Sequence, residues 1–174
     1  MDEPLRVRVP EWNKFAPSPS FKAYAESLQE QARAVFLKDK FHAEFVFLMP
    51  EDGDGALIQV KASDHNDRDR FAEWLRQVIK ARDVFGVVHI CEAWFYMRRG
   101  EKDHLLKQIL LNEIAPSELR AEDKREALSV MAQARDGYAR TWISEILRKG
   151  KGVSLDAATG FDSFSGRFGN LFAD

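Results

Sequence analysis

This chain of 174 residues contains a single cysteine, Cys91, so it cannot form an internal disulfide bond. Cys91 lies inside an apolar run, where a cysteine usually acts as a small buried hydrophobic residue. His42-Ala-Glu44 and His89-Ile-Cys91 place ligand-type residues close together, but the zinc deaminase signature that begins with H-x-E needs a following pair of cysteines. We therefore expect no metal ion and no other cofactor.

Long apolar runs and an excess of positive charge are also missing. No run approaches the roughly 20 residues that span a bilayer, and the first residues lack the apolar segment of a signal peptide. The 26 lysines and arginines are outnumbered by 28 acidic residues, which argues against nucleic acid as a partner. Nucleic-acid binding would have to use four basic residues: Arg98, Arg99, Lys149 and Lys151. We expect a cytoplasmic protein that does not enter a membrane.

The common catalytic motifs are absent, since the sequence has no G-x-S-x-G, P-loop or G-x-G-x-x-G pattern. The remaining enzymatic alternative is a metal-dependent nuclease, because the segment from Pro50-Glu-Asp52 to Gln59-Val-Lys61 resembles the core of the PD-(D/E)xK nucleases. The resemblance implies that Asp52 or Asp54 holds a divalent metal ion and that Lys61 positions or activates the attacking water. Gln59 stands where that family has an acidic residue, and a neutral amide binds Mg²⁺ more weakly than a carboxylate does.

Hydrophobic periodicity predicts one α+β domain over residues 21–158, with a mostly antiparallel sheet of about five strands and two to three helices packed on one face. Helical spacing of apolar residues occurs over residues 20–38, 63–86 (with Gly86 in the position that follows a helix) and 101–114. Strand patterns occur over residues 41–49, 56–62, 86–97, 126–134, 138–148 and 153–155. Residues 119–134 also fit a helix, but Asp136-Gly137 between two apolar runs favours a hairpin.

The apolar stretch from Gly86 to Met97 is typical of an interior strand, and Glu92 in its middle must find a partner, reach water or stay protonated. Alternation along a strand puts Glu92, Trp94 and Tyr96 on one side. Residues of neighbouring strands can join them on a single open sheet face, namely His42, Glu44, Gln59, Arg140 and Trp142. Tyrosine, tryptophan and arginine anchor protein interfaces, so this face predicts a partner-binding surface. The alternative is that the C-terminal region covers the face and that Glu92 pairs with Arg140.

The two ends of the chain differ from the domain. Residues 1–20 are rich in proline, and we expect them to form a flexible arm. Residues 159–174 form a tail rich in phenylalanine and glycine, in which spacings of three, four and four place these side chains on one helical stripe: Phe161, Phe164, Phe168 and Phe172. Glycines make an isolated helix unstable, so we expect the tail to fold on contact, either with the chain's own sheet or with a partner.

Three short motifs carry a resemblance to a known family: Glu92-Ala-Trp94 closing a strand, Pro116-Ser117, and Arg125-Glu126-Ala127-Leu128 opening the next strand. Over about residues 40–155 the chain resembles a family of small uncharacterised bacterial and phage proteins. The resemblance implies no activity and favours strands in the last third of the chain. We expect a non-enzymatic module that binds a protein partner, or assembles with itself, through these side chains: Glu92, Trp94, Tyr96 and Trp142 on the sheet, and Phe161, Phe164, Phe168 and Phe172 in the tail.

Overall fold

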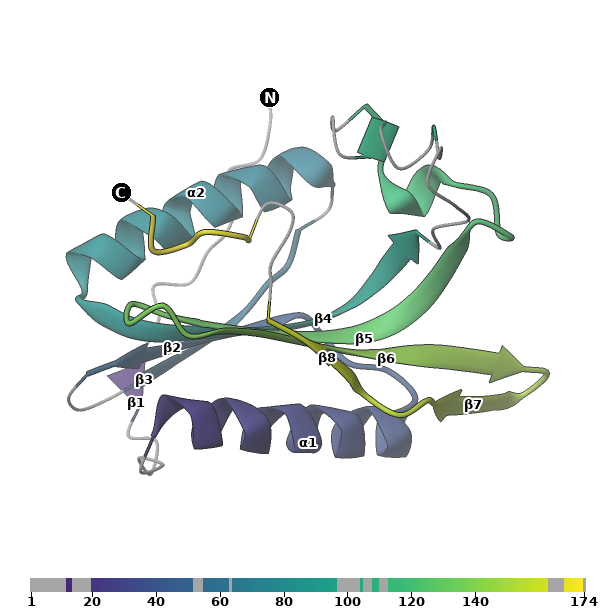
Figure 1. Cartoon of the computed structure of the whole chain (residues 1–174), viewed down its shortest axis with the longest axis horizontal. Helices are drawn as coiled ribbons and strands as arrows, with labels where there is room; N and C mark the ends of the chain where they lie inside the picture. Colours follow the sequence, from purple (N-terminus) through teal and green to yellow (C-terminus); the bar gives the residue numbers. More distant parts are fainter. Residues whose placement is uncertain are drawn as a thin grey trace.

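The computed structural model describes residues 12–13, 20–51, 55–62, 64–96, 104, 108–109, 113–162 and 168–173. In this part of the chain, eight strands form one antiparallel sheet, with helix α1 (Phe21–Asp39) against one face and helix α2 (His65–Ala81) against the other (Figure 1). The α+β class predicted from periodicity is confirmed. The number of strands exceeds the expected five, because the strands at residues 12–13 and 159–161 are too short to give a recognisable pattern.

The strands are β1 (Trp12–Asn13), β2 (Phe45–Pro50), β3 (Gly55–Gln59), β4 (Val84–Tyr96), β5 (Lys124–Ala134), β6 (Ala139–Lys149), β7 (Gly152–Leu155) and β8 (Thr159–Phe161). Their order across the sheet is β1-β3-β2-β4-β5-β6-β7, and β8 also pairs with β6. The central strand β4 pairs with β5 in one register from Gly86–Ala134 to Tyr96–Lys124. The hairpin predicted at Asp136-Gly137 is confirmed, since β5 and β6 meet there and Gly137 has a φ of 92°.

Helix α1 forms where its caps and its apolar spacing predict it. The hydroxyl of Ser20 accepts a hydrogen bond from the backbone N–H of Ala23, which satisfies one of the free donors at the helix start. At the other end Lys40 adopts a left-handed conformation, with a φ of 61°, and its N–H donates to the carbonyl of Phe36. The apolar stripe that includes Phe36 is buried against the sheet.

Helix α2 begins as expected but ends earlier. The carboxylate of Asp64 caps its start by accepting from the N–H of Asp67. The prediction that this helix runs to Gly86 is wrong, because α2 ends at Ala81 and β4 already begins at Val84. Gly86 is required for packing instead: a Cβ atom at this position would overlap the ring of Phe21 from α1.

The two helices lie on opposite faces of the sheet, so the expectation that all helices pack on one face is wrong. Helix α1 covers the side of β4 that carries Val88 and Ile90, whereas α2 covers the side that carries Val87. Both sides of β4 are apolar in this half of the strand, and each must be removed from water. The result is two hydrophobic cores, which we call the α1 core and the α2 core.

Two predicted segments lie largely outside the described residues. These are the third helix over 101–114 and the arm over 1–20. Within the arm, Trp12 and Asn13 pair with Ala56 and Gly55, which adds β1 to the edge of the sheet. A single 3-10 turn, η1 (Pro116–Glu118), precedes β5.

Candidate functional site

The residues predicted to share one open sheet face are divided between the two faces. Glu44 lies on the α2 side, where its carboxylate contacts His89. Trp142 lies on the α1 side and packs against the α1 core. Arg140 forms an ion pair with Asp162, so the alternative pairing of Glu92 with Arg140 is also wrong. A single open face does not exist, because strand alternation separates Glu44 from the others and α1 covers the middle of the remaining face.

Three of the predicted residues do lie together, at the C-terminal end of β4. Glu92, Trp94 and Tyr96 share one side of the strand, and this end of β4 and β5 curves away from α1 (Figure 1). Strand β5 places Glu126 opposite Trp94 and Lys124 opposite Tyr96, so these side chains lie on the same side. Trp94 is 43% exposed, and the Lys124 Nζ lies 4.6 Å from the centre of its ring. We name the following residues the distal surface: Glu92, Trp94, Tyr96, Lys124, Glu126 and Arg148.

The charged groups of the distal surface form a connected network. The Arg148 guanidinium donates two hydrogen bonds to the Glu126 carboxylate, from Nε to Oε2 at 2.7 Å and from Nη2 to Oε1 at 2.6 Å. The same Nη2 lies 3.6 Å from Glu92 Oε2. The other oxygen of Glu92 accepts a hydrogen bond of 2.6 Å from the backbone N–H of His42. Arg148 therefore balances the negative charge of two neighbouring carboxylates. The spacing of residues in the sequence did not identify Arg148 as a residue of this site.

The two carboxyl groups of this network have pKa values that are shifted in opposite directions. Burial raises the pKa of Glu92, and the negative charge of Glu126 adds to this shift. The hydrogen bonds from Arg148 lower the pKa of Glu126. Glu92 therefore takes up a proton before Glu126 does. Such a pair can accept and release a proton, and it lies beside the exposed ring of Trp94.

A second polar cluster is buried between the sheet and α2. The Nε2 atom of His89 lies 2.8 Å from Glu44 Oε1, and Arg68 Nη2 lies 3.3 Å from Glu44 Oε2. His89 is 3% exposed, and its Nδ1 atom has no hydrogen-bond partner. Burial alone would raise the pKa of Glu44, but the hydrogen bonds and charges of His89 and Arg68 outweigh burial and lower it. Burial also raises the pKa of Cys91 to about 12, so its thiol is not a nucleophile at neutral pH.

The four phenylalanines of the tail do not form one stripe. Phe161 belongs to β8, pairs with Thr141 and is exposed. Phe168 is buried in the α2 core, and Phe172 packs against the same core. Phe164 lies outside the described residues. Of the two outcomes left open for the tail, contact with the chain's own domain is seen for residues 159–161 and 168–173.

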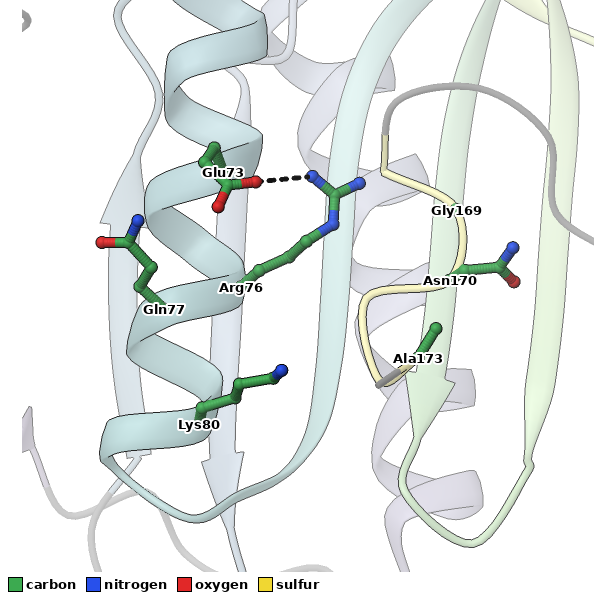
Figure 2. Close-up of a pocket in the computed structure, with 7 residues that line it drawn as sticks. All are labelled: Glu73, Arg76, Gln77, Lys80, Gly169, Asn170 and Ala173. Atoms are coloured by element: carbon green, nitrogen blue, oxygen red, sulfur yellow. Dashed lines mark ion pairs between the residues drawn. The ribbon is translucent and has the colours of Figure 1, made fainter.

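A groove separates part of the tail from α2 (Figure 2). Its volume is about 480 Å³, and it is lined by Glu73, Arg76, Gln77, Lys80, Gly169, Asn170 and Ala173. Figure 2 shows the side chains of Arg76 and Lys80 extending toward the tail, with Arg76 paired to Glu73 at 3.6 Å. The groove leaves one flank of the tail segment open to solvent.

The residues of the nuclease alternative are not assembled into a metal site that can be described. Asp52 and Asp54 lie outside the described residues. Gln59 and Lys61 are exposed at and just beyond the end of β3. In the described ranges, no three side chains of the His, Cys, Asp or Glu type are grouped so that they could hold a metal ion.

Comparison with known families agrees with the resemblance found in the sequence. A family model described as bacteriophage lambda protein ea47 matches residues 9–167. The chain belongs to the ea47 family. Glu92 and Trp94, which carried the resemblance to phage proteins, thus lie within the matched region and at the centre of the distal surface. No match to this ea47-family chain was found among curated proteins or among solved structures. Neither helix in the described part of the chain has the length and apolar composition that crossing a bilayer requires.

Proposed function

We propose that this ea47-family protein is a non-enzymatic accessory module of the cytoplasm that captures a protein partner through its distal surface. The observation that carries the proposal is the exposure of Trp94 on a regular part of the sheet. Tryptophan, tyrosine and arginine dominate the binding energy of protein interfaces when they sit together, and Tyr96 and Arg148 flank Trp94.

The surroundings of Trp94 support this role. The eleven residue pairs between β4 and β5 hold the backbone of Trp94 in place, so little backbone entropy is lost on binding. The carboxylates of Glu92 and Glu126 already have Arg148 as a counter-charge. A partner therefore has to supply an apolar cavity for the indole and hydrogen bonds for the charged groups around it. It does not need a large positive charge to balance the two carboxylates.

We leave two of the expected residues out of the proposed interface because their side chains pack inside the domain. Trp142 packs under α1, and Phe168 is buried in the α2 core. The proposal therefore rests on Glu92, Trp94 and Tyr96, with the exposed Phe161 on a separate edge of the sheet.

The test compares Trp94→Ala with Leu57→Ala, since Leu57 is 41% exposed on the distant strand β3 and serves as a matched control. Both full-length variants and the unchanged protein are immobilised, and proteins captured from a bacterial lysate are quantified by mass spectrometry. We expect a partner that Leu57→Ala retains and that Trp94→Ala loses by about thirtyfold, the effect of removing a hot-spot side chain. Equal capture by both variants, with circular dichroism showing that both are folded, would contradict the proposal.

A further inference from the structure

Residues 168–173 lie against the domain in the manner of a bound peptide. Phe168 and Leu171 are 7% and 2% exposed, and both belong to the α2 core. The ring of Phe168 meets the ring of Phe71 from α2 edge-on, with 6.1 Å between the centroids, and lies 4.3 Å from the ring of His89 on the sheet. The segment thus inserts two apolar anchors between the helix and the sheet.

The backbone of the segment is held by one side chain of the sheet. Gln133 of β5 donates from Nε2 to the carbonyl of Phe168 at 2.6 Å, and its Oε1 accepts from the N–H of Leu171 at 3.1 Å. Gln133 is itself buried. With the segment in place, both polar atoms of this buried amide have a partner. A glutamine that uses both ends of its amide on one short segment fixes the register of that segment.

The segment is not part of the sheet, and one of its flanks is open. Residues 168–172 form turns, and the N–H of Ala173 donates to the carbonyl of Asn170 within the segment itself. Figure 2 shows the segment running beside α2 across the groove lined by Arg76 and Lys80. Anchoring by side chains, without strand pairing, is one of the ways in which short peptides occupy grooves on globular domains.

We propose that the space between α2 and β5 is a peptide-recognition site for the sequence Phe-x-x-Leu-Phe, occupied here by residues 168–172, and that its ligand in trans is the same segment of a second copy of this chain. A second copy carries an identical ligand, and exchange of identical elements is a low-cost route to a dimer because each contact is already present in one copy. In such a dimer each α2 core is completed by Phe168 and Leu171 of the other copy.

The first test measures binding in trans with a fluorescent peptide of the sequence of residues 167–174. The receptor is the full-length chain with the double substitution Phe168→Ser and Leu171→Ser, which weakens its own ligand and keeps every residue that α2 and β5 contribute to the site. We expect the peptide to bind this receptor about tenfold or more tightly than the unchanged chain, whose own segment competes at a high effective concentration. A peptide with alanine at both anchor positions should bind about a hundredfold more weakly. Equal binding of the two peptides, or no binding to a folded receptor, would overturn the proposal.

Two measurements on the unchanged protein cover the case in which the double variant does not fold. The backbone amide hydrogen of Leu171 should exchange with solvent faster than those of β5, because the segment detaches while the domain stays folded. Exchange of Leu171 only with global unfolding would show that the segment is a fixed part of the core. Sedimentation of the unchanged protein should show a dimer whose fraction increases with protein concentration. A monomer at every concentration would overturn the assignment of the second copy as the ligand.

Discussion

Removing the carboxylate of Glu44 should cost a large part of the stability of this protein. Glu44 contacts His89 at 2.8 Å and Arg68 at 3.3 Å, and His89 has no partner on its other ring nitrogen. Glu44→Ala would remove the hydrogen bond at Nε2 and leave both ring nitrogens of the buried imidazole without a partner. An unsatisfied buried polar group costs about 1–3 kcal/mol, and breaking a buried ion pair costs about 3–5 kcal/mol. We expect the free energy of unfolding to fall by about 3 kcal/mol.

The matched control is Glu145→Ala, because Glu145 also pairs with an arginine but does so at the surface. Its Oε1 lies 3.2 Å from Arg125 Nε, and both side chains are more than a third exposed. Such pairs contribute roughly 0–1 kcal/mol. In urea, with an m-value of about 2 kcal/mol/M, the midpoint should fall by about 1.5 M for Glu44→Ala and by about 0.5 M or less for the control. Equal shifts would refute the reasoning that burial of the pair decides its contribution.

The pH dependence gives an independent check on Glu44. Although burial opposes it, the net effect of His89 and Arg68 is to hold the pKa of Glu44 below its ordinary value of 4.5. A carboxyl group with a lowered pKa in the folded state adds stability above its unfolded pKa and loses it as the pH falls through its folded pKa. The difference in unfolding free energy between the unchanged protein and Glu44→Gln should therefore have its largest value at neutral pH and become smaller below pH 4.5. A difference that grows in acid would contradict this.

Further expectations concern Glu92, Gly86 and Cys91. Burial and the adjacent carboxylate raise the pKa of Glu92, so its favourable contribution to stability is present in acid and is lost as the pH rises through its folded pKa. The urea midpoint of Glu92→Gln should therefore rise relative to that of the unchanged protein between pH 4 and pH 7. A constant difference between the two midpoints would refute this. Gly86→Ala should lower the free energy of unfolding by about 1–3 kcal/mol in urea, since the added Cβ displaces Phe21, whereas Gly152→Ala has room for its Cβ and should cost far less. Burial raises the pKa of Cys91 to about 12, so iodoacetamide at about pH 8 should label the unfolded chain much faster than the native protein; rapid labelling of the native protein would show that the thiol is accessible.

The local features of the fold could be predicted because they depend on neighbouring residues. Ser20 and Asp64 cap the helices through contacts three residues away. Asp136-Gly137 specifies its hairpin because Gly137 adopts a positive φ that few other residues tolerate. In each case the sequence pattern and the structure share one short-range cause.

The errors arise where the outcome depends on residues far apart in the chain. The contact of Glu44 with His89 joins residues 45 positions apart, and it depends on the register between β2 and β4, which no local pattern determines. The placement of the helices could have been inferred, since Val87 and Val88 on opposite sides of β4 both require a covering layer. The spacing of the tail phenylalanines was misleading, because β8 takes Phe161 before the turn that buries Phe168 begins.

The two halves of β4 differ in how deeply their side chains are buried. The half of the strand around Val87 and Ile90 is embedded in the two cores, and a substitution there alters packing throughout the domain. The half from Glu92 to Tyr96 is continuous with it in the same ladder but carries side chains that are half-buried or exposed. A single substitution in this second half changes a side chain at or near the surface and leaves the two cores unchanged. The two halves of β4 thus share one ladder with β5 but tolerate substitution to different degrees.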